Sequence, residues 1–188
     1  MAFPLIVLPG SAIVVLSVCL LIVFVEALEQ DLIGYAARSE EQLFHSVIRV
    51  SLGWTLLYFI FLFFQSATKF RAHSQARAQH KKNDDAPAWA APTLREVKYY
   101  GAGGDLGLLG DRTAGNMLEQ SVPFLLALWL HAIFVAPSTA ARIGWCWLLS
   151  RAVYPVCFRA GVPWLFISTL PGYLFIGLLL LPVAQRVI

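Results

Sequence analysis

Three polar residues with helical spacing stand at the start of an apolar segment. Arg112, Asn116 and Glu119 are separated by four and three residues, so on a helix their side chains share one face. The apolar segment that follows, Val122–Val135, is typical of a membrane span. Charged and amide groups at a bilayer boundary are costly unless they are paired or used. The pattern therefore predicts either a binding site or a polar collar that keeps a helix start among the lipid headgroups.

The three residue types suit a ligand that carries both signs of charge. A cationic Arg112 beside a helix N-terminus favours an anion such as a peptide carboxylate. Glu119 can accept a hydrogen bond from an ammonium, and Asn116 can both donate to and accept from an amide. A small peptide with free ends presents all of these groups.

The same stretch resembles a family signature. The run from Arg112 to Phe124 has the form Arg-x-x-x-Asn-x-x-Glu-x-x-x-Pro-Phe, which resembles that of the MAPEG family, the membrane-associated proteins of eicosanoid and glutathione metabolism. A second fragment, Arg151-x-x-Tyr154-x-x-x-Phe158, is similar to the family's Arg-x-x-Tyr-x-x-x-Tyr. The order and separation of the two fragments agree with the family, and together they anchor about the last half of the chain.

The resemblance implies a fold, a cofactor and a site. Family members are four-helix bundles, commonly homotrimers, that hold glutathione between subunits at the cytosolic side. By resemblance, glutathione would be bound here by Arg112, Asn116, Glu119 and Tyr154. Some members conjugate its thiol to lipophilic electrophiles or reduce lipid peroxides, with an arginine or a tyrosine hydroxyl stabilising the nucleophilic thiolate.

The chain departs from the family at positions that concern catalysis. Phe158 replaces the second tyrosine and has no hydroxyl. The family's arginine at the start of the last helix has no counterpart between Gly161 and Thr169. Arg151 and Arg159 are the remaining candidates for a catalytic role, and the register of Arg159 differs from the family's.

Two functions are therefore kept open. In the first, the chain is a glutathione-dependent transferase or peroxidase that acts on lipophilic small molecules. In the second, it is a non-catalytic accessory subunit of a larger membrane complex, and its additions to the family pattern contact partners. The first hypothesis predicts that the chain binds glutathione. The second predicts a stable complex with partner proteins.

Composition places the chain in a membrane. Of its 188 residues 59% are hydrophobic and 13% charged, whereas a soluble domain is about half apolar and about a quarter charged. The formal charge of +3 is small, and no basic stripe with interleaved aromatics suggests nucleic acid. The cysteines Cys19, Cys146 and Cys157 all lie in apolar segments without metal-ligand spacing, so we expect buried thiols and no metal.

Hydropathy predicts an all-α integral membrane protein with five spans. A four-helix MAPEG-like bundle would occupy residues 46–188 and contain a long loop, 66–110. An extra N-terminal membrane helix would occupy residues 1–27, followed by a polar connector, 28–45. The expected spans are Phe3–Val25, Val47–Gln65, Asn116–Val135, Ile143–Phe158 and Trp164–Val183.

Local signals refine these spans. Pro155 should kink the end of its helix, because proline lacks the N–H of a helical turn. Ser138 or Thr139 could cap the helix that follows Pro137. His131, in the middle of a span, is expected to pack against a neighbouring helix rather than to bind a ligand.

The charges of the connecting segments predict an orientation. The basic loop 66–110 and the turn at Arg159 fall on one side, and lysine and arginine mark the cytoplasmic or matrix side. The helix that starts at Asn116 would enter from this side, and the helix that ends at Phe158 would return to it. The glutathione residues would therefore share one depth in the bilayer. The membrane itself is left open, with an endomembrane and the mitochondrial inner membrane as candidates.

Overall fold

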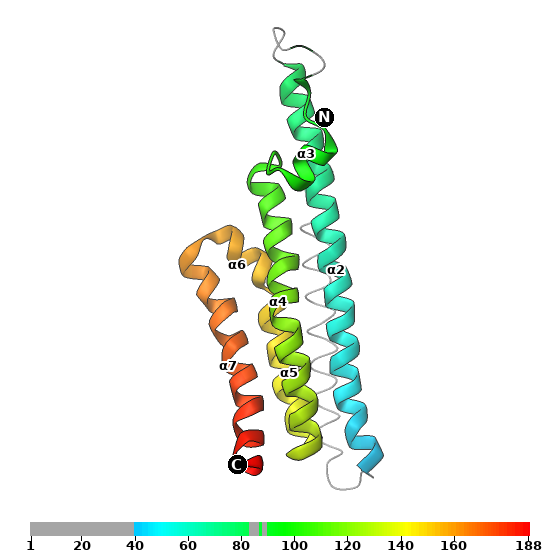
Figure 1. Ribbon diagram of the computed structural model, residues 1–188, viewed down its shortest axis with the longest axis vertical. Helices are drawn as coiled ribbons and strands as arrows, with labels where there is room; N and C mark the ends of the chain where they lie inside the picture. The colour runs from blue at the N-terminus through cyan, green and yellow to red at the C-terminus, as the bar shows by residue number, and fades with distance from the viewer. Residues whose placement is uncertain (1–39, 83–86, 88–89) are drawn as a thin grey trace. The chain divides into compact units, whose positions relative to one another are not determined.

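A computed structural model of the chain describes residues 40–82, 87 and 90–188 (Figure 1). The expected N-terminal span Phe3–Val25 and most of the connector 28–45 lie outside the described residues. Within those residues the structure is helical and contains no strand, so the all-α prediction is confirmed. The helices, in order, are α2 (Glu40–Lys81), α3 (Leu94–Tyr99), α4 (Gly104–Phe134), α5 (Pro137–Ala152), α6 (Tyr154–Ala160) and α7 (Val162–Val187).

Three of these helices, α2, α4 and α7, are long and apolar enough to cross a membrane. They contain the predicted spans Val47–Gln65 and Trp164–Val183, and Asn116–Val135 except for its last residue, so the prediction of an integral membrane protein is confirmed. The predicted span Ile143–Phe158 is instead divided between two helices. The longer one, α5, has 16 residues and is about 24 Å long, which is shorter than a hydrocarbon core of about 30 Å.

The segment 66–110 is not the loop that the sequence analysis expected. Helix α2 continues beyond Gln65 for another 16 residues to Lys81, and α3 and the start of α4 also lie in this segment. The continuation contains no glycine or proline and is rich in Ala, Gln, Arg and Lys, which favour helices. Thr93 and Glu96 form a capping box that starts α3, a Thr-x-x-Glu signal that is visible in the sequence.

The start of α4 also differs from the prediction. The helix begins at Gly104, well before Asn116, and runs through Gly107, Gly110 and Gly115 without a break. Arg112 therefore lies in the third turn, and the expectation that it stands beside a helix N-terminus is wrong.

The described chain divides into two compact units, and the division cuts across α2 and α4. The first unit contains residues 40–57 of α2, residues 120–134 of α4, and α5, α6 and α7. The second contains residues 58–81 of α2, α3, and residues 104–119 of α4.

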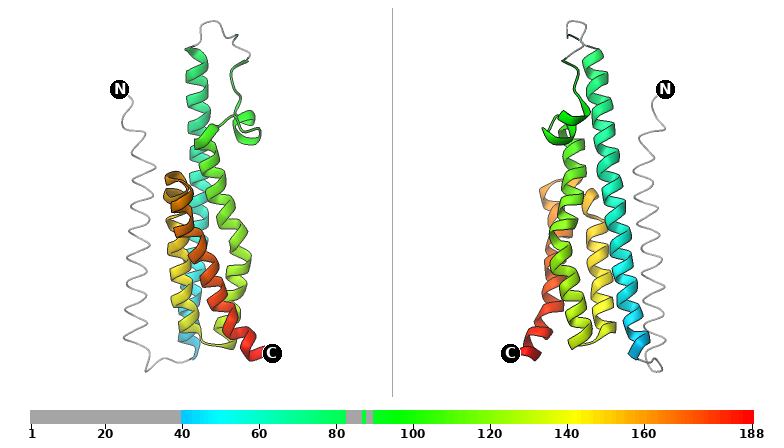
Figure 2. Two further views of the ribbon diagram at one scale, coloured as in Figure 1. Left: turned by 90° about the vertical axis from the view of Figure 1, so that its left-hand side faces the viewer. Right: turned by 45° about the vertical axis from the view of Figure 1, so that its right-hand side comes forward.

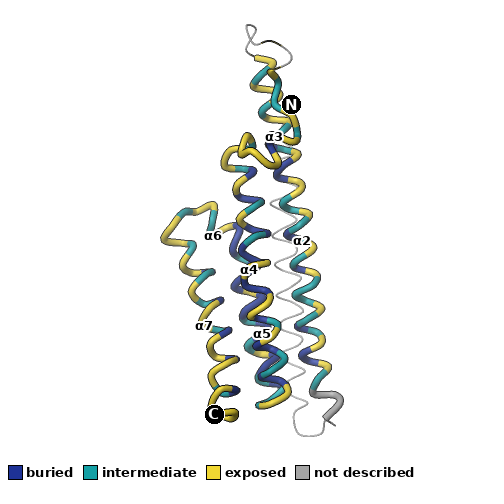
Figure 3. The backbone as a smooth tube through the Cα atoms, viewed as in Figure 1, coloured by how far each residue is buried: buried dark blue, intermediate teal, exposed yellow. Residues whose placement is uncertain are grey.

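Helix α5 forms the centre of the first unit. Ten of its 16 residues are buried, whereas only five of the 26 residues of α7 are, as the dark α5 and the largely yellow α7 of Figure 3 show. In both views of Figure 2, α5 runs beside the C-terminal part of α4. Gly144 of α5 allows this approach, since a Cβ there would lie 2.7 Å from Val50 and 2.9 Å from Leu128.

Two prolines shape the ends of α5. Pro137 is the first residue of the helix and Ala136 is its N-cap, so the expected cap by Ser138 or Thr139 is wrong. At the other end the helix stops at Ala152, and α6 begins at Tyr154 with Pro155 in its first turn. The missing N–H of Pro155 explains this break, which confirms the predicted kink.

Helix α7 passes through Pro171 and Pro182 without interruption. The carbonyl three residues before each proline is bonded by a basic side chain of another helix. Ser168 O accepts from Arg151 of α5, and Leu179 O lies 2.8 Å from Nδ1 of His131 of α4. Neighbouring side chains commonly satisfy backbone groups near prolines in membrane helices. The prediction that His131 packs against a neighbouring helix is confirmed.

Candidate functional site

The first fragment of the family signature lies on α4 in the second unit. Arg112 and Glu119 are exposed, whereas Asn116 between them is buried, with 7% of its surface accessible. Within the described residues, the side chains of Arg112 and Glu119 have no hydrogen-bond or ion-pair partner. The predicted face therefore presents one cation and one anion, with an amide set between them.

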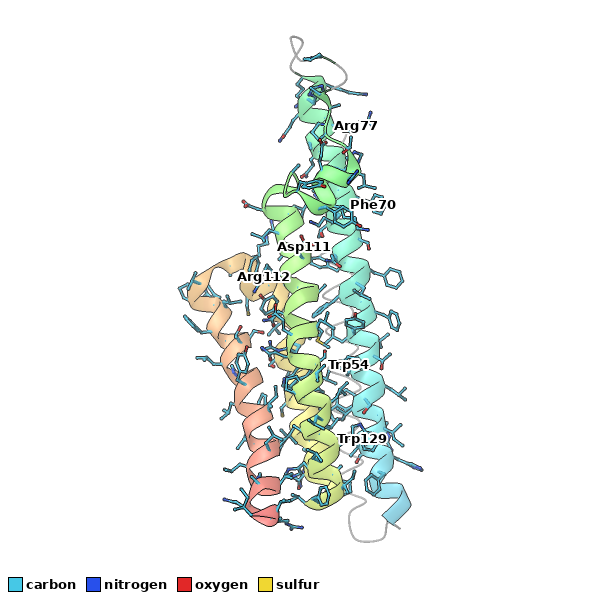
Figure 4. The ribbon with its side chains drawn as sticks, in the orientation of Figure 1. Trp54, Phe70, Arg77, Asp111, Arg112 and Trp129 are labelled. Atoms are coloured by element: carbon cyan, nitrogen blue, oxygen red, sulfur yellow. The ribbon has the colours of Figure 1, made fainter. Side chains whose placement is uncertain are left out.

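A second set of polar residues fixes α4 within the same unit. Asp111 forms an ion pair of 2.5 Å with the ammonium of Lys69, and Gln65 donates to its other oxygen at 2.9 Å. Figure 4 shows Asp111 on the side of α4 that faces α2, and Arg112 on a different side. Asp111 is thus occupied by structural contacts, and Arg112 stays available to a ligand.

Glycine at position 110 permits this close packing. A Cβ there would lie 2.0 Å from Oγ1 of Thr68 and 3.1 Å from Cα of Gln65. The group of Gln65, Lys69 and Asp111 was not predicted, because the segment after Gln65 was expected to be a loop. The regular helix-forming composition of residues 66–81 was the signal that could have found it.

The second fragment lies in the first unit, around a buried arginine. Arg151 is 0% exposed. Its Nη2 donates to the carbonyl of Ser168, and its Nε donates to Oγ of Ser150 at 3.4 Å. The guanidinium also lies 5.8 Å from the ring centroid of Trp147. Ser168 in turn donates to the Ser150 carbonyl at 2.5 Å, so these contacts join α5 to α7.

Two residues that the sequence analysis did not single out complete this group. Gly172 of α7 lies so close that a Cβ there would be 2.5 Å from Nη2 of Arg151 and 2.8 Å from Oε1 of Gln120. Gln120 is 1% exposed, and neither atom of its side-chain amide has a hydrogen-bond partner among the described residues. Gln120 could have been identified as a candidate residue from the sequence, because it directly follows Glu119 and precedes an apolar run.

Tyr154 and Arg159 have different surroundings on α6. Tyr154 is 2% exposed, and its ring stacks on Phe158 with 5.9 Å between centroids. Arg159 is exposed in the last turn, before Gly161 ends the helix with φ of 105°. The first unit thus holds Arg151 and Tyr154 in its interior and leaves Arg159 at its surface.

These arrangements separate structural cations from available ones. Arg151 is buried, and its Nε and Nη2 donate to Ser150 and Ser168, which favours a structural role over catalysis. Arg112 and Glu119 could bind a carboxylate and an ammonium through charge-assisted hydrogen bonds. No group of three or more His, Cys, Asp or Glu able to hold a metal occurs in the described part of the chain.

Fold and polar face together define an α-helical, multi-pass membrane protein with a face suited to a zwitterionic ligand. The MAPEG family model matches residues 50–184, and the chain belongs to the MAPEG family. Members of this family are glutathione-related transferases or peroxidases.

Comparison with individual proteins reaches a shorter segment. The uncharacterized protein sll1147 of Synechocystis sp. is 49% identical over 43 residues, which cover 23% of this chain and 31% of that protein. The match therefore spans less than a third of that relative's length. No solved structure matches the chain.

Proposed function

We propose that the chain binds glutathione on the polar face of α4, at the cytoplasmic or matrix side, through Arg112, Asn116 and Glu119. Membership of the MAPEG family carries this proposal, because the three residues match the family signature position by position. In the first unit, we propose Tyr154 as a binding residue because it matches the tyrosine of the second family fragment. The exposed charges of Arg112 and Glu119 support the proposal, since charges on a membrane helix are costly unless they have a use.

The spacing of the face suits a tripeptide. Glu119 lies seven positions after Arg112, which corresponds to about 10 Å along a helix. Three residues in an extended conformation span about the same length. Arg112 would pair with the carboxylate at the glycine end, Glu119 with the ammonium at the other end, and Asn116 with an amide between them.

A transferase or peroxidase reaction would require the thiolate of glutathione, which is the nucleophile. The hydroxyl of Tyr154 is the donor that the second fragment retains, because Phe158 has none. Arg159 is the exposed arginine closest to it in sequence and would assist, whereas Arg151 would position Tyr154 from within the helix pair α5 and α7. Lipophilic electrophiles or lipid peroxides would reach such a site from the bilayer.

We expect a homotrimer, as is common in the family. A neighbouring copy would then cover the exposed residues Arg112 and Glu119 and complete the ligand's surroundings. In the accessory-subunit alternative the same residues would contact a different chain, and glutathione would not bind.

The test is calorimetric titration of the full-length protein in detergent with glutathione. Arg112→Ala should weaken binding by about tenfold or more, because it removes a charge-assisted hydrogen bond. Arg142→Ala is the matched control, since Arg142 is also an exposed arginine but lies at the start of α5. Absence of binding by the unmodified protein at millimolar glutathione would refute the proposal and favour the accessory subunit.

A further inference from the structure

The part of α2 that lies in the second unit is strongly basic. Residues 66–82 contain seven basic side chains and no acidic one: Lys69, Arg71, His73, Arg77, His80, Lys81 and Lys82. Helix α3 adds Arg95 and Lys98, both exposed. These charges are not part of the proposed glutathione face, so they require a separate account.

The depth of each charge follows from α2 itself. The apolar run of this helix ends at Phe64, which marks the edge of the hydrocarbon. Lys69 lies five residues further on, about 7 Å along the helix axis. A headgroup layer is about 5–8 Å thick, so Lys69 lies within it.

Lys69 also sets the depth of α3. Its ammonium donates to the carbonyls of Val97 at 3.3 Å and Lys98 at 3.5 Å, besides its ion pair with Asp111. Val97 is fully buried, so the short helix is held against the unit on one side. The exposed side of α3 therefore lies at the level of the lipid headgroups.

On this exposed side, each of two tyrosines has a cationic side chain close to its ring. Tyr99 and Tyr100 are each 69% exposed. Lys98 Nζ lies 5.5 Å from the ring centroid of Tyr99, and the guanidinium of Arg95 lies 6.0 Å from that of Tyr100. We use the name collar for six residues: Arg95, Lys98, Tyr99 and Tyr100, with Phe70 and Arg71 of α2.

We propose that the collar binds the headgroups of anionic phospholipids. Tyrosines are enriched at the membrane interface, and basic residues next to a membrane helix attract anionic lipid. Two of the nearby acidic residues compete little for the collar's cations, and the third, Asp105 in the first turn of α4, is exposed. Asp111 is paired with Lys69, and the carboxylate of Glu96 accepts from both the backbone N–H and the hydroxyl of Thr93.

The same helix provides an internal control. Arg77 and Lys81 of α2, and Lys82 directly after it, are exposed, but they lie about 20–27 Å beyond Phe64 along the helix axis. Beyond a headgroup layer of about 5–8 Å, about 12–22 Å remain, which exceeds the Debye length of about 8–10 Å at ordinary ionic strength. Their attraction to lipid headgroups should therefore be largely screened, although their charge equals that of Arg71, Arg95 and Lys98.

The experiment is a titration of the full-length protein in detergent with phosphatidylglycerol, with phosphatidylcholine in parallel, read by native mass spectrometry. The triple variant Arg71→Gln, Arg95→Gln, Lys98→Gln should bind phosphatidylglycerol about tenfold more weakly or worse. The matched triple variant Arg77→Gln, Lys81→Gln, Lys82→Gln should bind it within about twofold of the unmodified protein.

Two results would overturn the proposal. One is an equal or larger loss in the control triple variant, which would assign the basic residues to an acidic soluble partner. The other is equal binding of phosphatidylcholine by the unmodified protein. The double variant Tyr99→Ala, Tyr100→Ala keeps every charge and should weaken phosphatidylglycerol binding less than the first triple variant, and circular dichroism of each variant verifies the fold.

Discussion

Among the described residues, the buried arginine and lysine side chains are Arg151 in the first unit and Lys69 in the second. Lys69 is paired with a carboxylate that is 40% exposed. Arg151 is fully buried and donates to two neutral oxygens, a carbonyl and a hydroxyl. The comparison teaches that a cation near the surface can be held by an opposite charge, whereas one inside a helix bundle can be held by carbonyl and hydroxyl dipoles.

The difference also shows which arginine remains for a ligand. Both buried cations join helices, α5 to α7 in the case of Arg151, and α2 to α3 and α4 in the case of Lys69. Arg112 has no such contact among the described residues and is exposed. Stability and ligand binding are therefore expected to respond to different substitutions.

The largest effect is expected for Arg151→Ala. The substitution leaves the Ser168 carbonyl without its donor and removes the side chain that packs on Trp147. We expect a loss of about 3 kcal/mol in the free energy of unfolding, from the unmade hydrogen bonds and the space left behind. Thermal unfolding in detergent measures it, with Arg142→Ala as control. An unchanged melting temperature together with lost glutathione binding would instead make Arg151 a ligand residue.

A smaller effect is expected when the space around Arg151 is filled. Gly172→Ala places a methyl group 2.5 Å from Nη2 of Arg151 and 2.8 Å from Oε1 of Gln120, so α7 must shift. Such overpacking costs about 1–3 kcal/mol. Gly177→Ala in the same helix meets nothing within 4 Å and should be neutral or stabilising by about 1 kcal/mol, because alanine favours helices. Equal melting temperatures for the two variants would contradict the close packing of α7 on Arg151.

The sequence was sufficient for features that depend on local pattern. Apolar runs located the spans in α2, α4 and α7, because about 20 apolar residues suffice to cross a bilayer. The break before Tyr154 followed from the missing N–H of Pro155. The spacing of Arg112, Asn116 and Glu119 was enough to predict a shared face, since all three lie in one continuous helix.

Features that depend on tertiary partners were not predicted. Lys69 and Asp111 are 42 residues apart, and they meet only because α2 continues past Gln65. The close approach of Gly172 to Arg151 and Gln120 joins three helices, so no local pattern marks it. The helix starts were misplaced because hydropathy marks where a helix enters the bilayer rather than where it begins.

The smallest effect is expected for Lys69→Met, because the carboxylate that loses its partner is partly exposed to solvent. Asp111 keeps its hydrogen bond from Gln65 and is partly exposed, so we expect a loss of about 1 kcal/mol, most of it local to α3. Hydrogen exchange of residues 94–99 should quicken, because two carbonyls of α3 lose their donor. Added salt should shrink the difference between Lys69→Met and the unmodified protein, whereas the effect of Arg151→Ala should persist. The same salt response for both variants would show that the two cations are held alike and would remove the contrast between the units.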